Sequence, residues 1–202
     1  LYGCTLSPKV EIADHSLRYV KRTDIKHVIG NDSNSKIVRW WSAEDFLVIR
    51  IHSKENLYAL AEKTGSTLYP NIYLCSNPGI KVILGIPKLY INGESIPSLR
   101  LHGKSTAHTI NEKGRYEYDI VLFLAWDKKR ALPDSVKNKS AQSHYLNYNL
   151  IINPDDVCIN IEGGNLVQTI KSNQVKTERA AIQNVTNTAL HGAVLTWKNH
   201  KK

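Results

Sequence analysis

The sequence predicts a mainly β, sandwich-like antiparallel domain with one or two short helices, including a C-terminal helix. Several runs of β-branched and aromatic residues are separated by clusters of Gly, Pro, Asn and Asp, which is typical of short strands joined by tight turns. Asn92-Gly93 lies between apolar runs and is a strong signal for a β-hairpin. Helical spacing of apolar residues is found mainly in residues 53–63 and 177–189.

The first half of the chain begins with a polar segment, residues 8–19, that leads into Val20. Residues 36–41 (KIVRWW) and 46–52 (FLVIRIH) have the composition of strands, and the short connection between them suits a hairpin. A short helix is expected next, at residues 53–63, with Ser53 as its N-cap.

The second half is more clearly β. Residues 115–126 (RYEYDIVLFLAW) alternate at first and then become continuously apolar, which indicates a strand that runs from an edge into the core. Gly163-Gly164-Asn165 is expected to form a turn or bulge, and Thr177 to cap the helix at 177–189. The other expected strands are apolar runs bounded by turn residues: 68–75, 81–86, 88–91, 145–152 and 157–161.

Composition indicates one globular domain of ordinary size. The chain has 202 residues, 42% of them hydrophobic, and a formal net charge of +9. This charge favours an acidic partner, but the only basic clusters are residues 128–130 and 198–202. A nucleic-acid binder would carry a denser basic stripe, so no nucleic-acid partner is expected. No apolar run is long enough to span a membrane.

Catalytic signatures are scarce. No G-x-S-x-G or H-E-x-x-H motif is present, and the eight histidines are scattered without metal-ligand spacing. The paired carboxylates Glu44-Asp45 and Asp155-Asp156 lie among turn residues, where such pairs usually shape the backbone. The sequence therefore predicts no catalytic residues, no metal site, no cofactor and no enzymatic activity.

The first four residues resemble a bacterial lipobox. Leu1 lies three places before Cys4 and Gly3 directly before it, although Tyr2 is larger than the residue usual at its position. The chain contains no Met, which fits the removal of an upstream signal peptide. The resemblance implies that Cys4 is the lipidated N-terminus.

The lipobox resemblance also implies a location and a domain division. Thr5, rather than the Asp that retains enterobacterial lipoproteins in the inner membrane, follows Cys4 and implies anchoring to the outer membrane. We expect residues 1–15 to be a tether and residues 16–202 a single β-rich periplasmic domain.

Assigning Cys4 to the lipid leaves Cys75 and Cys158 as one candidate disulfide pair. The oxidising periplasm permits such a bond, which would contribute about 4 kcal/mol through chain entropy. The alternative is that both residues are buried thiols in separate strands.

Several segments together resemble a group of small enterobacterial lipoproteins regarded as type VI secretion immunity proteins. The resemblance implies a β-sandwich-like periplasmic domain that neutralises a secreted toxin, often a lipase, by occluding its active site. It covers about half of the chain, within residues 69–182. The segments that carry it are 69–75, 88–93, 116–126, 156–165 and 172–175.

An inhibitor of this kind needs exposed aromatic and cationic anchors on a rigid scaffold. The candidate partner-binding residues are Trp40, Trp41, Arg100, Lys128, Lys129, Arg130, Tyr145 and Tyr148. Adjacent strand residues face opposite sides, so one of the two tryptophans is expected in the core. Loop 127–145 is the first choice for contact with the cognate toxin.

Two other classes of function remain open from the sequence. One is a structural or assembly lipoprotein of an envelope machine. The other is a basic nucleic-acid or glycan-binding domain.

Overall fold

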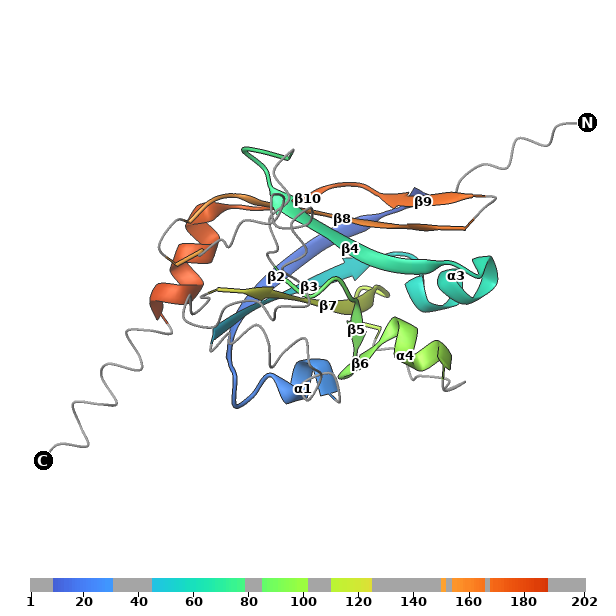
Figure 1. Cartoon of the computed structure of the whole chain (residues 1–202), viewed down its shortest axis with the longest axis horizontal. Coiled ribbons are helices and arrows are strands. Elements are labelled where there is room, and N and C mark those ends of the chain that lie inside the picture. The colour runs from blue at the N-terminus through green and yellow to red at the C-terminus, as the bar shows by residue number, and fades with distance from the viewer. Residues whose placement is uncertain are drawn as a thin grey trace, which may run out of the picture.

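The computed structural model describes residues 9–30, 45–78, 85–101, 110–124, 150–151, 154–165 and 168–188. These residues form two sheets of five strands each, packed face to face, with short helices around them (Figure 1). The predicted fold class, a mainly β sandwich-like domain with a C-terminal helix, is confirmed.

The first of the two layers, sheet B, is antiparallel throughout. Its strands in spatial order are β2 (Ile12–Lys21), β3 (Asp45–Ser53), β7 (Tyr116–Phe123), β5 (Tyr90–Ile91) and β6 (Glu94–Ser95). The turn between β5 and β6 has positive φ at both Asn92 (48°) and Gly93 (82°), the backbone of the type I′ hairpin that Asn-Gly predicts.

The second layer, sheet A, is organised around β8 (Val157–Gly164). One side of β8 pairs along its whole length with β4 (Thr67–Leu74). The other side pairs first with β10 (Val175–Thr177) and then with β9 (Thr169–Ser172). At the edge, β1 (Lys9–Val10) pairs in parallel with β9.

The main hydrophobic core lies between the two sheets. Alternate residues of each strand point into it, as the period of two requires. From β3 and β8 the buried residues are Leu47, Ile49, Ile51, Val157, Ile159 and Ile161.

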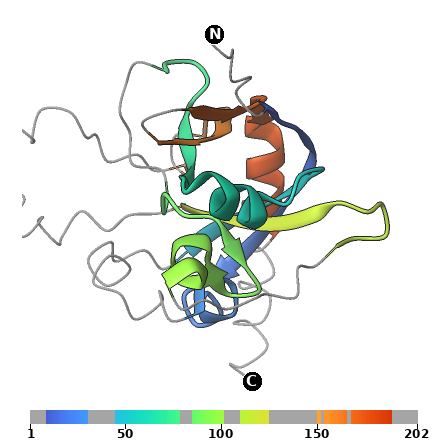
Figure 2. The same ribbon diagram turned by 90° about the vertical axis from the view of Figure 1, so that its right-hand side faces the viewer.

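A second, smaller core covers part of the outer face of sheet B. Phe46 and Val48 of β3 pack there with Val28 and Ile29 of α1 (Lys26–Ile29). Figure 2 shows α1 on the side of sheet B away from sheet A, whereas α4 (Ile96–Leu101) contributes Ile96 and Leu99 to the main core. Residues 46–49 of β3 are apolar on both faces because both faces are covered here, whereas the outer face beyond them, from Arg50 onwards, is polar.

The first predicted helix is shorter than expected. Helix α3 spans Leu57–Thr64, and Asn56 is its N-cap, with a side-chain oxygen that accepts from the Ala59 amide at 3.0 Å. The prediction of Ser53 as the cap is wrong, because Ser53 is buried as the last residue of β3.

The C-terminal helix spans residues 179–188. Thr177 does not cap it: this residue ends β10, and its buried hydroxyl has no hydrogen-bond partner among the described residues. Asp156, which directly precedes β8, takes that role, since its carboxylate accepts from the Arg179 amide at 2.7 Å. A hydrogen bond from Lys176, followed by the one from Arg179, lowers the pKa of Asp156.

The strand pairing of sheets A and B contradicts two further predictions, the extent of the N-terminal tether and the turn at Gly163-Gly164. The tether of residues 1–15 is wrong from residue 9 onwards, because Lys9 and Val10 pair with β9 and residues 12–15 begin β2. Gly163 and Gly164 continue β8 instead of forming a turn. A Cβ at Gly163 would lie 2.4 Å from the Thr67 carbonyl oxygen, so the strand needs glycine there to approach β4.

Candidate functional site

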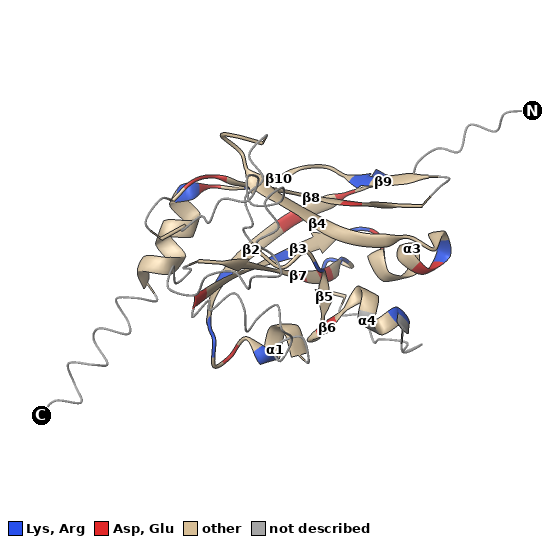
Figure 3. Cartoon of the chain, viewed as in Figure 1, with Lys and Arg blue, Asp and Glu red and all other residues tan. Residues whose placement is uncertain are grey.

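Charged residues occur along β2, β3 and β7, where the ribbon is coloured blue and red in Figure 3. The strand register places them on the part of the outer face of sheet B that α1 leaves uncovered. The antiparallel register places Asp14, His52 and Glu117 in one row and Arg50 beside Asp119 in the next. We call this surface the charged face, and its members are Asp14, Arg18, Arg50, His52, Arg115, Glu117 and Asp119.

A β-bulge in β2 places the side chain of Asp14 on the charged face. Ile12 pairs with Ser53 and Asp14 with His52, so two steps along β2 match one step along β3. In a regular strand residues 12 and 14 would share a face. The extra residue lets Ile12 enter the core while Asp14 turns to the charged face, which is a recognised use of bulges.

Asp119 is the centre of one half of the charged face. Arg50 donates to both of its carboxylate oxygens, from Nε at 2.8 Å and Nη2 at 3.0 Å. Arg18 donates to the same carboxylate from Nη2 at 3.0 Å, and Arg50 Nη1 also reaches Glu117 at 3.3 Å. The hydrogen bonds to Asp119 raise the pKa of Arg50. One carboxylate, 11% exposed at its side chain, thus fixes two guanidinium groups.

His52 is the centre of the other half. Its Nδ1 is hydrogen-bonded to Asp14, and its Nε2 lies 3.3 Å from a carboxylate oxygen of Glu117. Arg115 donates to the second carboxylate oxygen of Asp14. Burial raises the pKa of Asp14, but the His52 hydrogen bond and the charges of His52 and Arg115 outweigh it and leave that pKa lowered.

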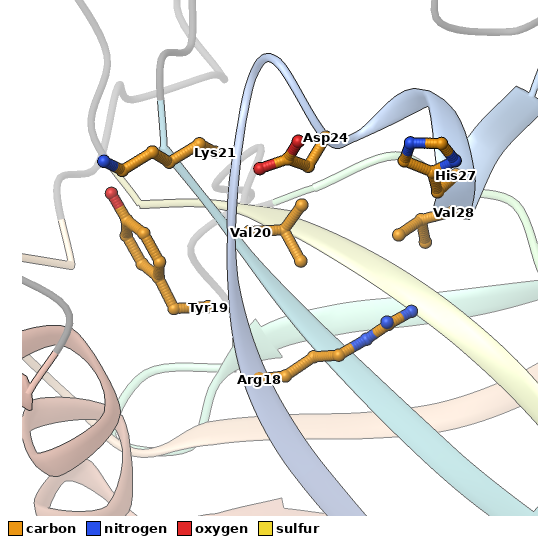
Figure 4. A pocket seen from close by; sticks show the side chains of 7 residues that line it. All are labelled: Arg18, Tyr19, Val20, Lys21, Asp24, His27 and Val28. Carbon is orange, nitrogen blue, oxygen red and sulfur yellow. The ribbon is translucent and has the colours of Figure 1, made fainter.

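A pocket of about 540 Å³ lies at the Arg18 end of the charged face (Figure 4). In the figure, Arg18, Asp24 and His27 surround the side chains of Val20 and Val28. Both valines are buried members of the smaller core and form an apolar floor. The pocket is lined by Arg18, Tyr19, Val20, Lys21, Asp24, His27 and Val28.

On sheet A, Cys75 and Cys158 form the disulfide that was expected from the sequence. Their Cα atoms are 5.1 Å apart, within the range of natural disulfides. Cys158 is buried in β8 and Cys75 follows the neighbouring strand β4 directly. The alternative of two free buried thiols is therefore wrong.

The predicted partner-binding residues are largely untested by the structure. Arg100 is half-buried on α4, and its Nη1 donates to the Ser66 carbonyl at 2.5 Å, a contact that ties α4 to the segment before β4. The lipidation and other anchor residues lie outside the described residues and stay predictions: Cys4, Trp40, Trp41, Lys128, Lys129, Arg130, Tyr145 and Tyr148.

Sequence reasoning missed the charged face. Its members come from three segments that are more than 30 residues apart along the chain, around positions 14–18, 50–52 and 115–119. The available signal was alternation, since Ser16 and Arg18 alternate with Leu17 and Tyr19 in a segment that was taken as simply polar.

Comparison of the chain with protein-family models, with curated proteins and with solved structures found no match. Across the described ranges, no helix is long and apolar enough to cross a membrane. Within the same ranges, no group of three His, Cys, Asp or Glu side chains is placed to hold a metal ion.

Proposed function

We propose that this protein is a periplasmic lipoprotein, anchored to the outer membrane through Cys4, that binds and neutralises a secreted toxin by stoichiometric occlusion. The toxin is a type VI effector, such as a lipase, and the protein itself is not an enzyme. The observation that carries the proposal is the charged face, which offers both signs of charge on a rigid sheet.

The charged face is organised before any partner arrives. Side chains of Arg18, Arg50 and Asp14 are 47%, 38% and 42% exposed, yet each is held by an ion pair within the face. Fixing long side chains in advance lowers the entropy cost of association. Groups that are both fixed and open to solvent can pair with complementary charges of a partner and set its orientation.

The disulfide supports the export of the protein. Structural disulfides persist in oxidising compartments such as the periplasm and are rare in the bacterial cytosol. Cys75 and Cys158 are joined across neighbouring strands of sheet A, so oxidation is compatible with the fold. A lipid on Cys4 would then keep the inhibitor beside the membrane, where a lipase acts, at a high effective concentration.

The test is capture of an exported partner from cells of the source strain, followed by kinetics with the purified pair. Arg18→Glu should slow association more than it speeds dissociation, and the effect should shrink at high salt. Arg179→Glu, an exposed arginine on the C-terminal helix, is the matched control. Charge reversal of Lys128, Lys129 and Arg130 tests loop 127–145. If this variant associates more slowly with the partner and Arg18→Glu does not, the loop and not the charged face is the contact surface.

Two results would overturn the proposal. One is the absence of any exported protein among the captured partners, together with turnover of a lipid or peptidoglycan substrate by the chain itself. The other concerns the anchor: the full-length precursor should incorporate a fatty-acid analogue, and Cys4→Ser should not. Continued labelling and membrane retention of that variant would remove the lipoprotein part of the proposal.

A further inference from the structure

Strand β2 is a long edge of sheet B. Among the described residues, no strand pairs with the side of β2 that faces away from β3. The Asp45 carbonyl accepts from the Leu124 amide beside β7, so Asp45 and its partner Lys21 are a non-hydrogen-bonded pair of the β2–β3 ladder. Because such pairs alternate along the ladder, His15 and Leu17 direct their backbone groups away from β3 and toward a further strand.

The other edge strands are closed to such pairing or are short. The Cys75 amide donates to the Asp156 carbonyl, and counting back along β4 places the backbone nitrogen of Pro70 on the edge away from β8. Proline has no N–H and blocks the addition of a strand there. Strands β1, β6 and β10 have only two or three residues. Within the described ranges, β2 is therefore the edge at which a further strand can be added.

The charges along this edge are complementary to those of a second copy of the chain. If a second β2 lies antiparallel with Ser16 opposite Ser16, Asp14 of each copy lies opposite Arg18 of the other. Each side chain is fixed within its own copy, Asp14 by His52 and Arg18 by Asp119, and remains 42% and 47% exposed. Opposite charges placed directly across a ladder stabilise the pairing, and a register centred on Arg18 would oppose like charges. The charges therefore select the register centred on Ser16.

We infer that the protein forms a two-fold symmetric dimer in which β2 pairs antiparallel with β2 of a second copy, joining the two sheets B into one continuous sheet. In this register His15 lies opposite Leu17, so the outward backbone groups of the two copies meet. A pocket of about 600 Å³ between Tyr19 and residues Asn184, Val185 and Thr188 of the C-terminal helix leaves space beside the edge. The inference does not rest on the proposed function, because the partner is the chain itself.

The first experiment is sedimentation equilibrium of the chain carrying Cys4→Ser, which removes the lipid attachment site and its thiol. The measured mass should rise to twice that of the chain with increasing concentration. Ser16→Glu in this background should weaken the dimer about tenfold or more, because two carboxylates meet on the symmetry axis. Within one copy the new carboxylate lies beside Arg50, so the fold is kept. Ser16→Gln, of similar size and without charge, is the matched control and should still dimerise.

A cross-link tests the register independently. In the inferred dimer the two Ser16 residues form a non-hydrogen-bonded pair with Cα atoms about 4.5 Å apart, within the range that a disulfide spans. Ser16→Cys in the same background should therefore give a covalent dimer on oxidation. Thr169→Cys, at an exposed position of β9, should not. A chain that stays monomeric at every concentration would overturn the inference. A dimer that withstands Ser16→Glu and is not cross-linked through Ser16→Cys would also overturn it, since another surface would then hold the two copies.

Discussion

The two sheets of the sandwich are fastened by different chemistry. In sheet A, strands β4 and β8 are cross-linked covalently by Cys75–Cys158. In sheet B, three strands are joined by shared charges, above all where Arg18 of β2 and Arg50 of β3 meet Asp119 of β7. Reducing agents should therefore weaken sheet A and leave the links within sheet B intact, whereas acid should weaken the ion pairs that join β2, β3 and β7.

The difference also separates the stability of the fold from the proposed recognition of a partner. A disulfide stabilises the fold without offering any group to a partner, and Cys158 is buried. Ion pairs contribute less to stability but leave oriented charges at the surface. The molecule thus has one layer that secures the scaffold and one that carries the candidate site.

The largest expected effect is removal of the disulfide. Cys75→Ala combined with Cys158→Ala should lower the free energy of unfolding by about 4 kcal/mol, because the unfolded chain regains the entropy of a long loop. Urea unfolding of the oxidised protein and the variant measures the difference, and reduced wild type should resemble the variant. Equal midpoints for oxidised and reduced protein would contradict the role given to sheet A.

Loss of the shared carboxylate in sheet B should have the next largest effect. Asp119→Asn leaves Arg18 and Arg50 without their common anion and should cost about 2 kcal/mol, less than for a fully buried pair. Glu112→Gln, at an exposed turn before β7, serves as the control and should be close to neutral. If Asp119→Asn is as stable as the control, the ion pairs do not join the strands.

Removal of the buried Tyr118 hydroxyl should lower the free energy of unfolding by a smaller amount. The hydroxyl oxygen of Tyr118 accepts a hydrogen bond from the Leu57 amide at 2.7 Å, at the first turn of α3. Tyr118→Phe leaves that amide unsatisfied and should cost about 1 to 2 kcal/mol in thermal or urea unfolding. Tyr69→Phe, at an exposed position of sheet A, is the comparison and should be nearly silent. Equal effects would show that the hydroxyl contact adds no stability.

The smallest expected effect is the pH dependence that Asp14 gives to the stability of sheet B. The pKa of Asp14 is lowered in the folded protein, so its contribution to stability is present above the ordinary Asp pKa of about 3.9. That contribution is lost as the pH falls through the folded-state value. The urea midpoint of wild type should therefore drop more between pH 7 and pH 3 than that of Asp14→Asn. An equal drop would mean that Asp14 is not stabilised by His52 and Arg115.

The sequence predicted the elements whose apolar pattern is simple. Residues 46–52, 68–75 and 115–126 correspond to β3, β4 and β7 because continuous or alternating apolar residues face a core there. Strand β2 was missed because its outward residues are Asp14, Ser16 and Arg18, which make the segment look like a polar leader. Its inward residues can be recognised as core residues only after the pairing of β2 with β3 is known.

The candidate site was harder to foresee for a related reason. Asp119 becomes the centre of the charged face only when the register sets Arg50 opposite it and Arg18 within reach, and register is a property of the folded sheet. The cap from Asp156 to Arg179 is similar, since it joins positions 23 residues apart. Local propensity favoured the neighbouring Thr177 for that role.

The first strand of sheet A pairs with a strand near the other end of the chain, and this sets an order for folding. β1 lies in parallel beside β9, and Asn173 binds Ile12 through both its side-chain oxygen, at 2.7 Å, and its nitrogen, at 3.0 Å. Contacts across so much sequence form slowly. A chain that emerges N-terminus first cannot close this layer until residue 173 has appeared. If the protein is exported as proposed, nearly all of the chain crosses the membrane before sheet A can be completed. The chain would therefore remain unfolded, and able to pass through a narrow channel, during transport.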